Sequence, residues 1–258
     1  MPTYLGIDLA WGPRARTGLA ALGSDGRLVA SASVRTDEEI LAFVATHSPD
    51  ETVAAVDAPL VVPNAAGSRA CEKAVTRAFG AYSAGAYPAN RTNPAFDPPR
   101  AEVLAQRCGW LTDPAVPPGQ GRSVVVEVYP HPAMVSLFGL GSVLPYKAKQ
   151  GRDLTSLRAA FLLVLDHMDR VCDEPLRLAD SARWTQIRRT VEVATRKSEL
   201  GLAEDEVDAI LCAHLAWLWG QGDPRMLVLG TATDGYIVVP GLPTVPPSRP
   251  VAVPAARP

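Results

Sequence analysis

Short apolar runs separated by turns dominate the start of the chain. They predict three short strands, at residues 3–9, 17–23 and 27–34. Asp25-Gly26, between the second and third runs, is typical of a hairpin turn. A capping-box sequence begins at Thr36 and leads into apolar residues at helical spacing. The next run, 52–56, is apolar throughout, so we expect a strand that is buried on both faces and returns beside the first.

The rest of the chain alternates between helical patterns and proline-rich stretches. The remaining expected elements are helices at 68–79, 101–108, 155–171, 182–200 and 204–219, a strand at 123–128, and a hairpin at 226–229 and 236–239. We therefore expect one domain over residues 1–239, with a helical and loop insertion at 58–122 that is a natural place for a cap over a site. Prolines dominate residues 240–258, and we expect this tail to be disordered.

Acidic residues stand where three of these strands end, at Asp8, Asp57 and Glu127. A fully apolar strand has no packing need for an acid, which favours a functional role. The first and fourth strands are expected to be neighbours, so Asp8 and Asp57 should lie ~5 Å apart, close enough to share a divalent ion. Glu127 would begin ~10 Å from Asp8, so contact with a second metal and a role in organising water both stay open.

A further group of acids lies at the start of the helix expected at 204–219. Asp208 is followed by apolar residues three, four and seven positions later, which predicts that it lies on the inward face. Asp205 lies one turn earlier on nearly the same face, but Asp205 and Glu206 could instead complement the helix dipole. We favour the dipole role for Glu206 and leave Asp205 open. The candidate metal ligands are therefore Asp8, Asp57, Asp205 and Asp208, with Mg²⁺ or Mn²⁺ as the expected ion.

Several basic residues are candidates for contact with phosphate. Arg69 lies in a basic stretch of the insertion, whose other interpretation is a solvated helix face. Lys147 and Arg152 lie on a glycine-bearing loop after the fifth strand, where either side chain could contact a phosphate. His131 could transfer protons, although a histidine in a proline-rich turn is more often simply exposed.

The composition is that of an ordinary globular protein, with 47% hydrophobic and 20% charged residues. No apolar run approaches the ~18 residues that cross a bilayer, and no signal-peptide pattern is present, so we expect no membrane partner. The four cysteines are far apart and form no CxxC pair, which favours a reducing cytoplasm over a zinc knuckle or a disulfide framework. A net charge of -2 gives no general support for a polyanionic partner.

Four motifs in order resemble a known family. They are the residues from Gly6 to Gly12, Val56 to Leu60, Glu127 to Pro130 and Asp205 to Ala209. Together, over roughly residues 3–220, they are similar to the predicted RNase H-like nucleases of domain-of-unknown-function family 429. The resemblance implies an α/β, ribonuclease H-like fold: a five-stranded mixed sheet, three antiparallel strands followed by parallel strands, with helices on both faces. The Asp-x-x-Asp pair on the last helix is also similar to that of Holliday-junction resolvases.

The function expected from this set is hydrolysis of phosphodiester bonds in RNA or DNA. Two divalent ions held by Asp8, Asp57 and Asp208 would activate water and stabilise the leaving oxygen, with Glu127 as a further catalytic candidate. The sequence does not choose between RNA and DNA. One alternative is a binding module that keeps the fold without chemistry. Another is an actin-like phosphotransferase or ATPase, but such proteins need a glycine-rich turn where Leu9 and Trp11 stand, and a second similar domain.

Overall fold

The computed structural model describes residues 2–12, 15–48, 50–149 and 151–248. Its strands are β1 (Thr3–Asp8), β2 (Thr17–Leu22), β3 (Leu28–Val34), β4 (Thr52–Val56), β5 (Val124–Glu127), β6 (Met226–Thr231) and β7 (Gly235–Pro240). Its helices are α1 (Asp37–His47), α2 (Ala70–Phe79), α3 (Arg100–Cys108), α4 (Pro130–Phe138), α5 (Leu154–Val171), α6 (Asp173–Leu176), α7 (Ala182–Val193) and α8 (Lys197–Gly220), with 3-10 turns η1 (Gly80–Tyr82) and η2 (Leu178–Asp180).

Five of the strands form one mixed sheet in the order β3-β2-β1-β4-β5. β1 is antiparallel to β2, and β2 to β3, whereas β1 and β4 and then β4 and β5 run parallel. This confirms the expected α/β fold with a five-stranded mixed sheet. The turn into α1 also forms as expected, because the Thr36 side chain accepts from the Glu39 amide and the Glu39 side chain accepts from the Thr36 amide.

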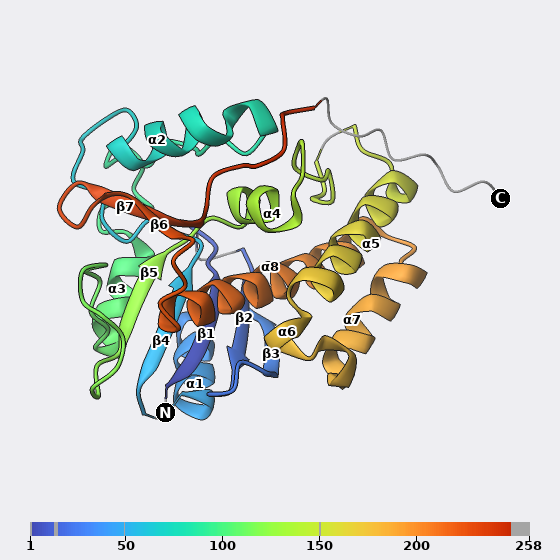
Figure 1. Cartoon of the computed structure of the whole chain (residues 1–258), viewed down its shortest axis with the longest axis horizontal. Coiled ribbons are helices and arrows are strands. Elements are labelled where there is room, and N and C mark those ends of the chain that lie inside the picture. The colour runs from blue at the N-terminus through green and yellow to red at the C-terminus, as the bar shows by residue number, and fades with distance from the viewer. Residues whose placement is uncertain (1, 13–14, 49, 150, 249–258) are drawn as a thin grey trace.

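Helix α8 lies directly across one face of this sheet (Figure 1). Two glycines permit the close approach. A Cβ atom on Gly6 would lie 2.0 Å from the Ala209 carbonyl oxygen, and one on Gly18 would lie 1.7 Å from the Asp205 carbonyl oxygen. Because neither glycine has a side chain, the helix backbone rests on β1 and β2. The interior of α8, including Asp205 and Asp208, is therefore held near the end of β1.

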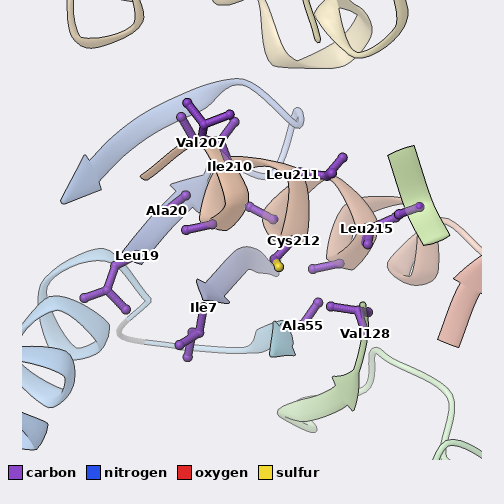
Figure 2. Close-up of a cluster of buried hydrophobic side chains, with 14 of the residues drawn as sticks. Ile7, Leu19, Ala20, Ala55, Val128, Val207, Ile210, Leu211, Cys212 and Leu215 are labelled. Atoms are coloured by element: carbon purple, nitrogen blue, oxygen red, sulfur yellow. The ribbon is translucent and has the colours of Figure 1, made fainter. Parts of the chain in front are cut away.

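The opposite face of the sheet is covered by α1. Figure 2 shows Ile7 and Leu19 pointing away from α8, whereas the next residue along β2, Ala20, points toward it. Side chains of successive strand residues alternate between the two faces, so both sides of β1 and β2 are buried. This explains why these runs are apolar throughout rather than alternating with polar residues.

The insertion and the C-terminal hairpin form a second, smaller packing unit. Helix α2 packs against β6 and β7, and all three lie beyond the carboxyl ends of the parallel strands (Figure 1). Their shared apolar cluster includes Val75, Phe79 and Ile237. The hairpin itself forms as expected, as an antiparallel pair.

The structure differs from the sequence-based expectations in three places. We expected Pro130 only to end a strand, but it is the first residue of helix α4. A proline is tolerated there because the first amide of a helix has no hydrogen-bond partner within the helix. The break between α7 and α8 lies at 194–196, so the predicted boundary near residue 201 is wrong. Within residues 240–248, where we expected disorder, Pro240 ends β7, Tyr82 Oη donates to the Val245 carbonyl at 2.8 Å, and the Ser248 amide donates to the Gly141 carbonyl at 2.8 Å. The remaining expected tail, 249–258, lies outside the described residues.

No helix in the described part of the chain is long and apolar enough to cross a membrane.

Gly6→Ala tests the contact between helix and sheet. The added methyl group would meet backbone atoms of α8 at 2.0 and 2.2 Å, so we expect a loss of about 3 kcal/mol or more in the free energy of unfolding. Urea denaturation measures it. Gly201→Ala is the matched control, because no atom lies within 4 Å of its added Cβ, and a helical alanine should add about 0.5–1 kcal/mol. Equal stability of Gly6→Ala and wild type would show that α8 does not rest on β1.

Candidate active site at the carboxyl end of the sheet

The carboxylates of Asp8 and Asp57 lie at the carboxyl ends of two neighbouring parallel strands. Ile7 pairs with Val56 in the β1–β4 register, and the Asp57 amide donates to the Ile7 carbonyl at 2.8 Å. Strand alternation places Asp8 on the same face as Gly6, which is the face that α8 covers. The acids that end these strands therefore point toward the acids of the helix.

Asp208 completes this group from α8, where it is fully buried. Its Oδ1 accepts a hydrogen bond from the Tyr146 hydroxyl at 2.7 Å. Its Oδ2 accepts no hydrogen bond, but Lys147 Nζ lies 2.6 Å away as an ion-pair partner. Lys147 Nζ also lies 3.5 Å from Glu204 Oε1, one helical turn before Asp208. A single ammonium group thus balances several carboxylates.

The pKa values show that this balance is incomplete. Removal from water, together with the charges of Asp208 and Asp57, raises the pKa of Asp8 well above its usual range, although Lys147 opposes this. Burial, opposed by Lys147 and reinforced by Asp208, raises the pKa of Asp57 to about 7. The same causes raise the pKa of Glu204 to about 7. Burial would lower the pKa of Lys147, but the charges of Asp208, Tyr146 and Asp8 raise it well above its usual range. If every carboxyl group were ionised, the site would carry more negative charge than Lys147 balances, so these carboxyl groups bind protons more readily than free ones.

These carboxylates fit a hard divalent cation in their chemistry but not in their present arrangement. Oxygen ligands are what Mg²⁺ and Mn²⁺ prefer, and the buried Asp208 Oδ2 has no hydrogen-bond donor. Within the described residues, however, no three histidine, cysteine or acidic side chains are grouped as a metal site. Lys147 lies against the oxygen that an ion would use. A metal site there would require the ammonium to move away from Asp208 and the carboxylates to come closer together.

Glu127 lies apart from this group. By register it is beside Val56 rather than Asp57, one residue short of the position that would face Asp8. Its carboxylate is buried and receives Arg69 Nη2 at 2.6 Å and the Leu60 amide at 2.9 Å. Burial raises its pKa, and Arg69 opposes the shift. Arg69 in turn bonds Glu72 at 2.8 Å. Arg69, our candidate for phosphate contact, is thus a buried counter-ion at the pocket wall.

Asp205 and Glu206 are engaged on the β3 side of α8. Asp205 Oδ2 accepts from Ser33 Oγ at 2.8 Å and lies 3.7 Å from Arg16 Nε. Burial raises the pKa of Asp205, opposed by Ser33 and Arg16. Glu206 is buried and pairs with Arg183. Our interpretation of Glu206 as a first-turn acid is wrong, because α8 begins at Lys197 and the residue lies in its interior.

Two further side chains of the predicted site surround the Lys147 loop. Arg152 Nη1 donates to the Lys147 carbonyl at 2.8 Å and so ties the two ends of this loop together, with the Arg152 side chain half-buried. His131 is at the start of α4, and its Nδ1 lies 3.4 Å from the Tyr129 hydroxyl. Burial, together with the positive charge of Lys147, lowers the pKa of His131 to about 4. The imidazole is therefore neutral at pH 7.

A pocket of about 280 Å³ opens over these groups. Asp8, Asp57 and Lys147 line its acidic part, and Glu127 and His131 line another side. The remaining lining residues are Leu9, Trp11, Ala58, Pro59, Arg69, Glu72, Ala86, Tyr87, Val128, Tyr129, Lys149 and Ile237. The insertion at 58–122 thus forms one wall of the pocket, which matches the position expected of a cap.

Sequence reasoning missed Glu204 and Tyr146 as members of the site. Glu204 precedes Asp208 by four residues, so helical spacing alone would have placed both on one face. Tyr146 lies next to Lys147 in an irregular loop, and no periodic pattern relates it to a helix about sixty residues later. Only the folded chain brings its hydroxyl to Asp208.

The fold and the site together define an α/β protein with a five-stranded mixed sheet and a carboxylate pocket at the ends of its parallel strands. The chain belongs to the family described as "Protein of unknown function (DUF429)", whose model matches residues 6–230. This confirms the resemblance carried by the four motifs. No curated protein and no solved structure gives a significant match.

The raised pKa of Asp57 predicts a pH-dependent stability. The carboxyl titrates at about 7 in the folded protein and at ~4 in the unfolded chain. The folded state therefore binds more protons between these values, so without metal the free energy of unfolding falls as pH rises from ~4 to ~7. The free energy of unfolding of Asp57→Asn should exceed that of wild type by about 4 kcal/mol at pH 8, with no difference near pH 4.

Urea denaturation in a chelator at the two pH values measures this difference. Asp223→Asn is the control, and its effect should have the opposite sign. Hydrogen bonds from Arg225 lower the pKa of Asp223, so removal of this carboxylate should lower the free energy of unfolding at pH 8. A variant Asp57→Asn that is less stable than wild type at pH 8 would contradict the raised pKa of Asp57.

Proposed function

We propose that this protein is a metal-dependent phosphodiesterase that hydrolyses RNA or DNA. The observation that carries the proposal is the meeting of Asp8, Asp57 and Asp208, from two parallel strands and a helix, whose carboxyl groups raise one another's tendency to hold a proton despite the nearby Lys147. A divalent cation is the partner that such a site lacks. The family match supports the fold and is silent on activity.

Asp8, Asp57 and Asp208 are the residues that would hold Mg²⁺ or Mn²⁺. When bound, the ion would lower the pKa of a water ligand and stabilise charge on the phosphoryl oxygens. The Tyr146 hydroxyl fixes the carboxylate of Asp208 through Oδ1 and leaves Oδ2 for the ion. Neutral His131, on the pocket wall, can form a hydrogen bond to a substrate or water without adding charge to the pocket.

The basic side chains divide between structural and substrate roles under this proposal. Arg69 keeps the pocket wall in place through Glu127 and Glu72. Lys147, which pairs with Asp208 here, would be available to a substrate phosphate in the same pocket if an ion took its place on that carboxylate. We also propose a cytoplasmic location, because all four cysteines are free thiols.

A second candidate is a binding module without chemistry. It is favoured by one observation, the ion pair of Lys147 with Asp208, which fills the site with the protein's own cation. Metal binding separates the two candidates, because only the first requires an ion to displace Lys147.

Asp8→Asn tests the phosphodiesterase proposal. Manganese should raise the melting temperature of wild type, since an ion at 100 times its Kd adds about 2.7 kcal/mol. The variant should lose that shift and should cleave bis(p-nitrophenyl) phosphate, single-stranded RNA, RNA–DNA hybrid and branched DNA no faster than buffer. Glu192→Gln, an exposed acid on α7, is the control and should keep both properties. Cleavage by Asp8→Asn at the wild-type rate would reject Asp8 as part of the site.

Lys147→Met tests whether metal and ammonium compete for Asp208. The variant leaves a buried carboxylate unpaired, so without metal it should lose about 3–5 kcal/mol of stability. Its affinity for Mn²⁺, measured by calorimetry, should rise about tenfold or more because the competitor is gone. Lys149→Met, on the same loop and exposed, should change neither quantity. Undetectable Mn²⁺ binding by both wild type and Lys147→Met would favour the binding module.

A further inference from the structure

Trp11 is an exposed aromatic side chain at the mouth of the acidic pocket. It is 43% exposed, whereas Trp110 and Trp184 are 8% and 3% exposed and the remaining two tryptophans are partly buried. It is three residues after Asp8, on the turn that leaves the site. Tyr87, on the wall that the insertion supplies, is 64% exposed and lines the same pocket. Large apolar rings at a polar pocket mouth indicate contact with a ligand.

The indole of Trp11 packs against the ring of Phe96. Its ring meets that of Phe96 edge to face, with centroids 5.0 Å apart, and Phe96 is itself buried. An aromatic contact of this kind fixes the orientation of the exposed ring. The platform is therefore ordered before any ligand arrives.

Trp11 also joins the acidic pocket to a second hollow. It lines a depression of about 470 Å³ formed with Arg35, Thr36, Asp37, Glu38, Pro94, Ala95, Pro98 and Arg100. The charges there are mixed, and Arg100 Nη2 is paired with Asp37 Oδ1 at 2.6 Å. Mixed donors and acceptors suit the hydrogen-bonding edge of a base better than a phosphate. Trp11 therefore lines both the hollow and the pocket.

We propose that Trp11 is a base-stacking platform that selects single-stranded nucleic acid. A strand crosses the pocket mouth with a phosphodiester group at the acidic site and the adjacent base on the indole. A base can stack there only when it is unpaired, so a duplex is disfavoured. This inference rests on the proposed function, because it identifies the substrate class of the same site.

The test is binding of fluorescein-labelled 12-mers by anisotropy, with calcium in place of magnesium, using single-stranded RNA, single-stranded DNA and a DNA duplex. Trp11→Leu should weaken single-strand binding about tenfold or more, and Trp11→Phe should weaken it less. Val193→Ala, an exposed apolar residue on the distant helix α7, should leave it unchanged. Single strands should also reduce iodide quenching of the wild-type tryptophan fluorescence, and this protection should be absent in Trp11→Phe.

Hydrolysis of bis(p-nitrophenyl) phosphate separates this inference from the proposed function, because that small ester does not need the platform. If Trp11→Leu binds single strands within twofold of wild type, or if wild type binds the duplex equally well, the inference is overturned even when the ester is hydrolysed. If Trp11→Leu loses binding while no preparation hydrolyses any ester, the platform stands and the phosphodiesterase proposal falls. Binding of no oligonucleotide by wild type overturns the platform.

Discussion

The close contact of one helix backbone with two strands is the constraint on which the site depends. Gly6 and Gly18 leave no room for a side chain under α8, so the helix lies directly on β1 and β2. That short separation brings Asp208 to the ends of strands whose own acids are Asp8 and Asp57. A longer separation would let water screen the carboxylates from one another, and their pKa values would stay ordinary. Packing at two glycines thus determines the electrostatics of the pocket.

Lys147 supplies the positive charge that lies among the buried acidic side chains. Without it, a fully buried Asp208 and its neighbours would be too costly to hold near one another as anions. With it, the folded chain carries its own cation, whose Nζ lies 2.6 Å from Asp208 Oδ2. Tyr146 binds the other oxygen and keeps the carboxylate fixed. The site is organised in advance, and the ammonium is the one member whose four-carbon stem permits it to move.

Local patterns were enough to predict the sheet and the strand-end acids. Parallel neighbours align at their carboxyl ends, so Asp8 and Asp57 followed from two apolar runs. The break before α8 was missed because the Glu199 carboxylate caps the amides of Thr195 and Arg196, while Gly201 resembled a helix end but is tolerated inside the helix. The ion pairs of Arg69 with Glu127 and of Lys147 with Asp208 join residues about sixty positions apart. No periodicity specifies such pairs, because side chains distant in sequence meet only through the tertiary fold.

The order in which the chain leaves the ribosome has a consequence for this pocket. All five strands of the large sheet have been synthesised once the ribosome has passed Glu127. Helix α8, which covers one face of that sheet, is complete only when Gly220 has been added. Ile237, on β7, is the last pocket residue along the chain, and β7 also packs against α2 of the early insertion. A nascent chain that ends before Gly220 therefore has Asp8 and Asp57 but lacks the complete helix α8 and the β7 side of the pocket. The complete pocket therefore cannot form before Ile237 has been synthesised.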